Sequence, residues 1–259
     1  MTQPHILITN DDGLHAPGIK ALYLALKQIA TVTVVAPVTE QSGVSQKITF
    51  TEPLRVLQIE TNGSGITYGI HGTPSDCVQL GVNAILESPP DLIISGINQG
   101  ANNALTTFHS GTAGAAREGA LLGIPSIAVS LASHTSADFS YASHIAVRTA
   151  QLILKYGLPQ DTFLNINVPA KKKEEINGIR VTSLGMSRFR GKYKADNDHR
   201  GKGFYWMVGA LINFDQDNPF SDTAALQDNA VSITPILLSQ TNNAYIETLK
   251  QIVDTADFS

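Results

Sequence analysis

Two adjacent carboxylates, Asp11 and Asp12, are the side chains of this sequence best suited to chemistry. They lie in the turn-forming run Asn10-Asp11-Asp12-Gly13, directly after an apolar, β-branched stretch at residues 5–9. Adjacent carboxylates repel each other, and a bound cation is the usual remedy. Hard oxygen ligands of this kind suit magnesium, manganese or calcium. The alternative is that both aspartates only cap the helix that follows.

Two further oxygen-bearing side chains follow other predicted strands. Ser42 lies in the polar loop after the apolar run at residues 30–37, and Asn98 ends the run at residues 90–98. Together with Asp11 and Asp12 they would form an all-oxygen site for a hard cation, with water in its open positions. Ser42 and Asn98 also suit ordinary turns, which is the alternative for each.

A helix of small residues is predicted at 109–120, and Ser110-Gly111-Thr112 opens it. Free amides in the first turn of a helix favour a phosphate, and the two hydroxyls add donors. Such a helix also arises from close packing on a sheet, so the pattern alone allows both interpretations. His109 is a candidate proton donor or phosphate contact, although packing is its favoured role. A cation site beside a phosphate site predicts metal-assisted hydrolysis of a phosphate ester.

The elements that must position these residues alternate between strands and helices. Apolar runs at 5–9, 30–37, 90–98, 123–130 and 163–169 predict buried strands, and amphipathic or small-residue segments at 19–26, 77–86, 109–120 and 140–156 predict helices. Right-handed crossovers bring the loops after parallel strands to one edge of a sheet, where ligands bind in open α/β folds. Residues 49–59 and 65–70 predict a small antiparallel pair, with Asn62-Gly63-Ser64-Gly65 as its turn. The expected class is therefore α/β, with a mostly parallel sheet flanked by helices.

The chain changes character after Lys171-Lys172-Lys173. Residues 188–203 are polar and basic, residues 204–208 predict a strand, and a last strand and helix are expected at 230–236 and 241–253. We therefore expect a catalytic core at 1–170 and, at 171–259, an arm with a closing strand and helix. The arm either packs on a second copy of the chain or covers the site as a loop.

Composition narrows the possible partners and the compartment. The net charge of −4 argues against binding a nucleic-acid polymer, which favours basic proteins. The single cysteine, Cys77, excludes an intramolecular disulfide framework, and it has no basic neighbour that would make it a nucleophile. Neither a signal peptide nor an apolar run of membrane-spanning length is evident, so we expect a cytoplasmic protein without a membrane partner.

Several motifs, in order along nearly the whole chain, resemble those of the survival protein SurE family of metal-dependent 5'-nucleotidases. The matching stretches are Asn10-Asp11-Asp12-Gly13, Ala16-Pro17-Gly18-Ile19, Ser42-Gly43, His71-Gly72-Thr73-Pro74-Ser75-Asp76, Ser95-Gly96-Ile97-Asn98, Ser110-Gly111-Thr112, Gly123-Ile124-Pro125-Ser126 and Val231-Ser232-Ile233-Thr234-Pro235. The sequence departs from the family at residues 104–109 and at Asn229-Ala230, neither of which touches the proposed ligands. These departures bear on substrate preference and subunit packing.

The resemblance implies a role for each candidate residue. It implies one divalent cation, Mg²⁺ or Mn²⁺, on Asp11, Asp12, Ser42 and Asn98, with the two aspartates as the catalytic residues. It implies substrate contacts from Asn102, Ser110, Gly111 and Thr112. It further implies a Rossmann-like core and a homodimer or homotetramer that exchanges C-terminal segments. The expected substrates are nucleoside 5'- and 3'-monophosphates, and for some members short polyphosphate.

Other classes of function compete with this interpretation. A non-catalytic, regulatory nucleotide-binding module would use the same pocket without turnover. A phosphatase with an aspartyl nucleophile typically separates its two acids by one residue, whereas Asp11 and Asp12 are adjacent. A dinucleotide dehydrogenase is disfavoured because the first strand is not followed by Gly-x-Gly-x-x-Gly.

Overall fold

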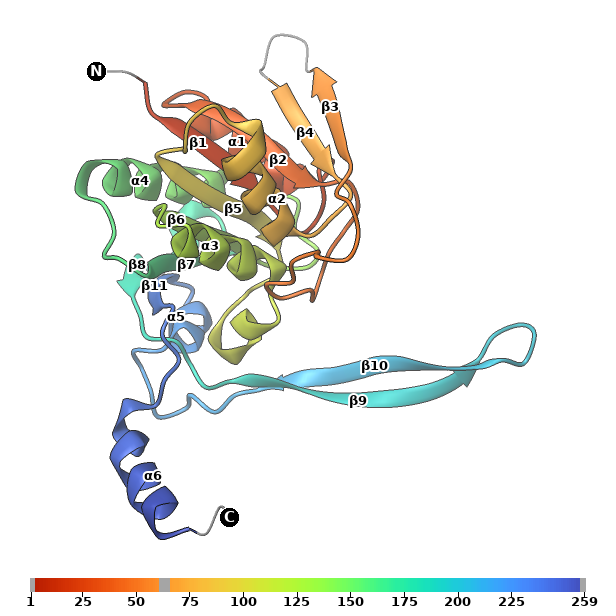
Figure 1. The fold of residues 1–259 in the computed structure, drawn as a ribbon, viewed down its shortest axis with the longest axis vertical. Coiled ribbons are helices and arrows are strands. Elements are labelled where there is room, and N and C mark those ends of the chain that lie inside the picture. Colours follow the sequence, from red (N-terminus) through yellow and green to blue (C-terminus); the bar gives the residue numbers. More distant parts are fainter. Residues whose placement is uncertain (1–2, 61–65, 257–259) are drawn as a thin grey trace.

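A single mixed sheet forms the centre of the molecule (Figure 1). The computed structural model describes residues 3–60 and 66–256, so the predicted turn at 62–65 lies outside the described residues. Nine strands of the described chain make up this sheet. Their order across it is β3 (Val56–Glu60), β4 (Ile66–Ile70), β2 (Thr31–Pro37), β1 (His5–Thr9), β5 (Leu92–Gln99), β6 (Ser126–Ala132), β7 (Thr162–Pro169), β11 (Val231–Leu237) and β8 (Ile179–Val181).

The six strands from β4 to β7 are parallel, and β1 is where the chain reverses its direction across the sheet. From β1 the chain proceeds outward through β2 to β4, and it then returns to β5 on the other side of β1. Strands β3 and β11 run antiparallel to β4 and β7. This arrangement confirms the predicted fold class. Its topological switch point lies between β1 and β5, the place where open α/β sheets bind ligands.

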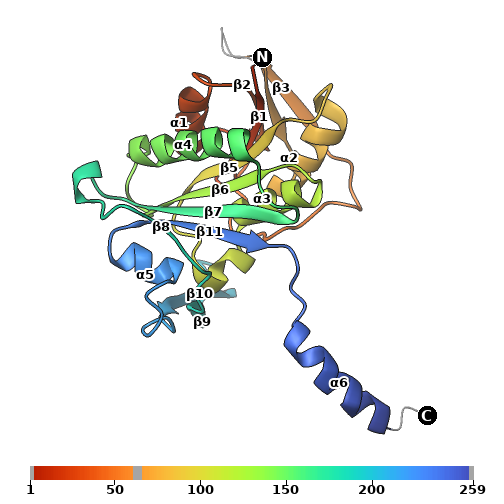
Figure 2. The ribbon, with the colours of Figure 1, turned by 90° about the vertical axis from the view of Figure 1, so that its left-hand side faces the viewer.

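Helices cover both faces of the sheet (Figure 2). Helices α1 (Pro17–Leu26) and α4 (Ser140–Tyr156) share a hydrophobic cluster with Ile6 and Ile8 of β1. Leu7 points to the opposite face and clusters with α2 (Pro74–Leu80) and α3 (Gly111–Leu121). The alternation follows from the two-residue period of a strand. Cys77 lies in this second cluster, where burial raises the pKa of its thiol well above the ordinary value, as expected of an inert cysteine.

Near Asp76 the structure confirms one predicted element and corrects another. The helix predicted over 77–86 is present with its capping turn, in which Thr73 is the N-cap and forms a capping box with Asp76, and a π-helical turn, η1 (Gly81–Ile85), ends it. The strand predicted at 49–59 is wrong for residues 49–55. Asp76 accepts hydrogen bonds from the backbone N–H (2.8 Å) and the hydroxyl (2.7 Å) of Thr49. These contacts hold Thr49, the first residue of the segment, away from a strand ladder.

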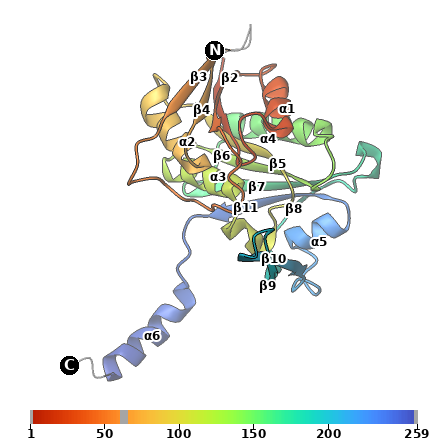
Figure 3. The same ribbon diagram turned by 90° about the vertical axis from the view of Figure 1, so that its right-hand side faces the viewer.

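The C-terminal part of the chain contributes both to the sheet and to two projections. Strands β9 (Arg188–Asn197) and β10 (Gly203–Ile212) form a long antiparallel hairpin, hereafter the arm, that extends away from the body (Figure 1). The strand predicted at 204–208 is the middle of β10. Helix α6 (Asn243–Thr255) also stands apart from the body (Figure 3), and all its residues are exposed. The remaining short helices are η2 (Ala104–Phe108), η3 (Lys173–Glu175) and α5 (Asp222–Gln227).

Within residues 3–60 and 66–256, no helix is both long and apolar enough to cross a membrane.

Candidate active site

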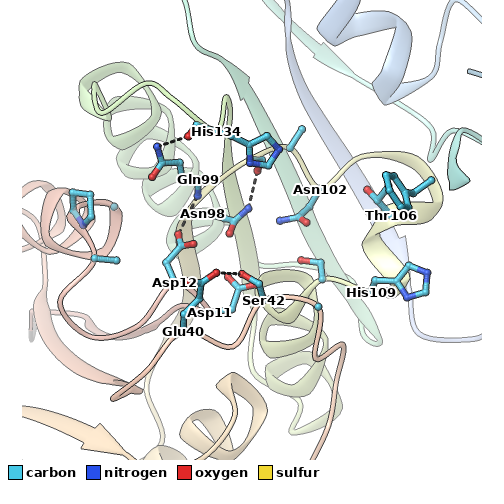
Figure 4. Close-up of a pocket in the computed structure, with 18 of the residues that line it drawn as sticks. Asp11, Asp12, Glu40, Ser42, Asn98, Gln99, Asn102, Thr106, His109 and His134 are labelled. Atoms are coloured by element: carbon cyan, nitrogen blue, oxygen red, sulfur yellow. Dashed lines mark hydrogen bonds between the residues drawn. The ribbon is translucent and has the colours of Figure 1, made fainter. Parts of the chain in front are cut away.

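A cavity of about 920 Å³ opens at the carboxyl edge of the parallel strands (Figure 4). Loops after β1, β2, β5 and β6, the start of α3 and the base of the arm surround it. Six of the eight predicted site residues line this cavity, namely Asp11, Asp12, Ser42, Asn98, Asn102 and Ser110. The other two, Gly111 and Thr112, lie behind Asp11, which they contact.

Asp11 is a buried carboxylate at the start of the loop after β1. Its Oδ1 accepts a 2.5 Å hydrogen bond from the Thr112 hydroxyl, and its backbone carbonyl accepts one from Gln41 N–H at 2.7 Å. A Cβ at Gly111 would lie 2.8 Å from the Asp11 Cβ, so only glycine allows this approach. Burial raises the pKa of Asp11 above its ordinary value, against the lowering effect of the Thr112 hydrogen bond.

Asp12 is the more accessible of the pair. Its Oδ2 accepts a 3.0 Å hydrogen bond from the Gln99 backbone N–H, which ties the loop after β1 to the end of β5. Burial is the main cause that raises the pKa of Asp12 to about 6, and the charges of Asp11 and Glu40 add to the rise. The Gln99 hydrogen bond and His134 act in the opposite direction. Two neighbouring carboxylates that resist ionisation are short of positive charge, which a cation would supply.

Ser42 faces the cavity from the loop after β2. Its Oγ donates a 2.7 Å hydrogen bond to Glu40 Oε1. The serine proton is thereby directed to Glu40, and the lone pairs of Oγ remain available to another partner.

Asn98 reaches the same cavity from β5, just after a register shift between β5 and β6 at residues 95–98. Bulges of this kind often re-aim a side chain beside an active site. The Asn98 side chain is buried, and its Nδ2 donates to the Gly100 carbonyl at 2.7 Å. Its Oδ1 is then the atom of the amide best placed to contact a cation. Figure 4 shows Asp11, Asp12, Ser42 and Asn98 gathered around one part of the cavity.

Asn102 and Ser110 line the neighbouring part of the cavity. The backbone of Asn102 is held by Asn167 (2.8 Å) and Asn165 (2.7 Å), and its Nδ2 donates to Ser130 Oγ at 3.0 Å. Ser110 caps α3, where its Oγ accepts the Ala113 N–H at 3.0 Å. The Ser110 proton and the N-terminus of α3 are suited to an anion. The Gly111 and Thr112 backbone amides in this first turn also hydrogen-bond Asp11 and act to lower its pKa. The Thr112 hydroxyl, a predicted phosphate donor, instead donates to Asp11.

The donor set fits a hard divalent cation. The described residues that line the cavity include Asp11, Asp12 and Glu40 but neither lysine nor arginine. A phosphate dianion entering this cavity therefore needs a cation to offset the carboxylates. Within residues 3–60 and 66–256, no three or more His, Cys, Asp or Glu side chains converge as metal ligands. Two carboxylates, a hydroxyl and an amide oxygen with water suit Mg²⁺ or Mn²⁺ better than Zn²⁺.

Glu40, His134, Phe189 and Met207 are among the lining residues that the sequence analysis did not single out. Glu40 and His134 follow β2 and β6, so a search of every loop after a parallel strand would have found them. His109 also lines the cavity and is exposed. Phe189 and Met207 belong to the arm, and their place at the cavity follows from how the arm meets the body.

Comparisons with known proteins show which proteins this chain is similar to. The family model described as survival protein SurE matches residues 6–191. A protein named 5'-nucleotidase SurE from Chlorobium limicola is 41% identical over 251 residues, which cover 97% of each chain. A protein of the same name from Moorella thermoacetica is 42% identical over 245 residues, which cover 94% of each chain. The crystal structure of the SurE protein from Aquifex aeolicus superposes with a TM-score of 0.83 at 40% identity, covering 97% of this chain and 100% of that one.

Proposed function

This chain belongs to the survival protein SurE family, and from that membership we propose that it is a 5'-nucleotidase, a hydrolase of phosphoric monoesters. Its substrates would be nucleoside 5'- and 3'-monophosphates, with short polyphosphate as a further candidate. One divalent cation, Mg²⁺ or Mn²⁺, would assist the reaction. The observation that carries the proposal is the juxtaposition, in one cavity, of two desolvated carboxylates and the N-terminus of α3.

Asp11, Asp12, Ser42 and Asn98 would hold the cation. When bound, such a cation neutralises phosphate charge, polarises the ester and lowers the pKa of a water molecule. The role of the protein is to fix the four oxygens. Gln99 N–H holds Asp12, and Thr112 holds Asp11. Glu40 holds the Ser42 hydroxyl, and the Gly100 carbonyl holds the amide of Asn98.

Asn102, Ser110 and the first amides of α3 would hold the phosphate. Asn102 is fastened to β6 and β7 through Ser130, Asn165 and Asn167, so its position is fixed before substrate arrives. Preorganised donors of this kind stabilise charge that develops in the transition state. Thr112 would act indirectly, by orienting Asp11.

The proposal is tested by incubating the protein with a panel of nucleoside monophosphates and Mg²⁺ or Mn²⁺. Release of nucleoside and inorganic phosphate in equal amounts supports the hydrolase. A folded protein that binds these nucleotides in an equilibrium titration, without releasing phosphate, supports the alternative of a non-catalytic regulatory module.

We also propose that residues 171–259 serve assembly as a homodimer or homotetramer, while residues 1–170 form the catalytic core. Both projections expose large apolar side chains, among them Trp206 and Tyr205 on the arm and Ile246, Leu249 and Ile252 on α6. Exposed apolar surface of this extent favours a protein partner. Light scattering on the full chain as it elutes from a gel-filtration column measures the number of copies in the assembly. A variant lacking residues 243–259 is measured in the same way for comparison.

A further inference from the structure

The arm contributes an apolar wall to the cavity, opposite in character to the carboxylates. Phe189 and Gly191 of β9 and Met207 of β10 line it. We propose that Phe189 is a specificity-determining residue, on whose ring the base of the nucleotide stacks, with Met207 at its edge. This inference rests on the proposed function and adds the position of the base.

The arm leaves space for the Phe189 ring to lie across its two strands. Gly191 and Gly209 face each other in the register of the hairpin. A Cβ at Gly209 would lie 2.7 Å from Phe189 Cζ, and a Cβ at Gly191 would lie 3.5 Å from Met207 Sδ. The ring therefore occupies the space that a side chain at position 209 would fill. Because these two glycines have no side chains, the Phe189 ring and the Met207 thioether can pack directly on the backbone of the arm.

The base of the arm is fastened beside the phosphate end of the cavity. Ser187 carbonyl accepts the Leu105 N–H at 3.0 Å, which joins the arm to η2, shortly after Asn102. The buried Asp215 carboxylate accepts the Met186 N–H (2.7 Å) and the Ser187 N–H (2.9 Å). These contacts fix Met186 and Ser187, which lie three and two positions before Phe189. The apolar wall thus keeps its place relative to the phosphate donors.

The size and chemistry of the cavity suit a nucleoside as well as a phosphate. Its volume of about 920 Å³ is in the range of small-molecule sites and far exceeds the needs of a phosphate group. Phe189 is 43% exposed and Met207 60% exposed, so both offer apolar surface to a ligand. Every nucleobase has an aromatic face, and stacking on an aromatic side chain tolerates all of them. Broad base preference is therefore expected, with purines favoured by their larger area.

The test compares two substrates that share a sugar and a phosphate but differ in the base. KM is measured for adenosine 5'-monophosphate and for ribose 5-phosphate with the wild type and with Phe189→Ala, Phe189→Tyr and Tyr193→Ala. Tyr193 is the matched control, since it lies on the same face of β9 further along the arm and does not line the cavity. Phe189→Ala should raise KM for the nucleotide about 10-fold, a typical loss for one stacked base. It should leave ribose 5-phosphate unchanged, and Phe189→Tyr should restore the nucleotide value.

An equal change for both substrates on Phe189→Ala, or no change for either, would overturn the proposal. If equal losses come with a change in the sedimentation of Phe189→Ala, Phe189 belongs to an interface between copies. If the wild type cleaves neither substrate, the proposed function fails instead. The same comparison is then made by equilibrium binding of the two ligands, where loss of the nucleotide alone still supports stacking.

Discussion

Thr112 and Asp11 are joined by a 2.5 Å hydrogen bond that spans 101 positions of sequence. The hydroxyl on the first turn of α3 donates to the carboxylate after β1. Gly111 reinforces the contact, because its lack of a side chain lets α3 approach Asp11 closely. The contact between Thr112 and Asp11 thus fixes the position of the proposed cation site relative to the proposed phosphate site.

Thr112→Val tests whether the Thr112 hydroxyl orients Asp11, separately from the contribution of the Thr112 side chain to packing. Valine keeps the shape of threonine but cannot donate, so Asp11 loses its partner while the core stays filled. A hydrogen bond to a charged group contributes about 1.5–3 kcal/mol, which corresponds to a loss of kcat/KM of ~10-fold or more. Thr112→Ser keeps the donor and should stay near the wild type. Equal kinetics for the valine and serine variants would contradict the assignment.

The raised pKa of Asp12 makes metal-free protein sensitive to pH. Its ordinary pKa is 3.8, and burial raises it to about 6 in the folded chain. The folded state therefore holds its proton more tightly than the unfolded state. This carboxylate penalises folding fully above pH 6 and no longer does so below about pH 3.8. The contribution of Asp12 to stability should accordingly fall as the pH rises through this window.

Asp12→Asn should remove that penalty together with metal binding. In chelator at pH 7, the melting temperature of this variant should exceed that of the wild type by about 2–4 °C, after allowance for solvent screening. Added Mn²⁺ should raise the melting temperature of the wild type but not of the variant. Scanning calorimetry at pH 5 and pH 7 measures both effects. A variant less stable than the wild type in chelator at pH 7 would count against a desolvated carboxylate.

Glu40 offers a test of how Ser42 is oriented. Glu40 accepts a hydrogen bond from the Ser42 hydroxyl. Glu40→Ala removes this acceptor, so the lone pairs of Ser42 Oγ should lose their orientation toward the cation. Mn²⁺ binding should weaken about 10-fold, which is typical when a metal ligand loses its hydrogen-bond partner. Glu40→Gln keeps an acceptor and should lose less. In a Ser42→Ala background, Glu40→Ala should have little further effect. Isothermal titration with Mn²⁺ measures the affinity of the wild type, the two single variants and the double variant. Fully additive losses would show that Glu40 acts independently of Ser42.

The sequence predicted those parts of the site that depend on a strand and the turn after it. Asp11, Asp12 and Asn98 could be placed because apolar runs end at them, and parallel strands bring such ends to one edge. The partner of Thr112 could not be predicted, since its hydroxyl is equally suited to a phosphate and to a carboxylate from a distant loop. Residues 49–55 show alternation typical of a strand, yet they form a loop whose first residue, Thr49, is hydrogen-bonded to Asp76.

The arm was the least predictable part. Every residue of β9 is exposed, so no buried face imposes alternation on its sequence, and only its partner strand makes it a strand. The place of Phe189 at the cavity depends on contacts with Leu105 and Asp215, which no local pattern encodes.

Phosphate release by metal-stripped protein tests the central claim most directly. Wild type and Asp11→Asn are treated with chelator, freed of it, and given a nucleoside monophosphate with increasing Mg²⁺ or Mn²⁺. The wild type should be inactive in chelator and recover with metal, while Asp11→Asn stays folded but inactive at limiting metal. Turnover in excess chelator, or full turnover by Asp11→Asn at limiting metal, would contradict a cation held by these two aspartates.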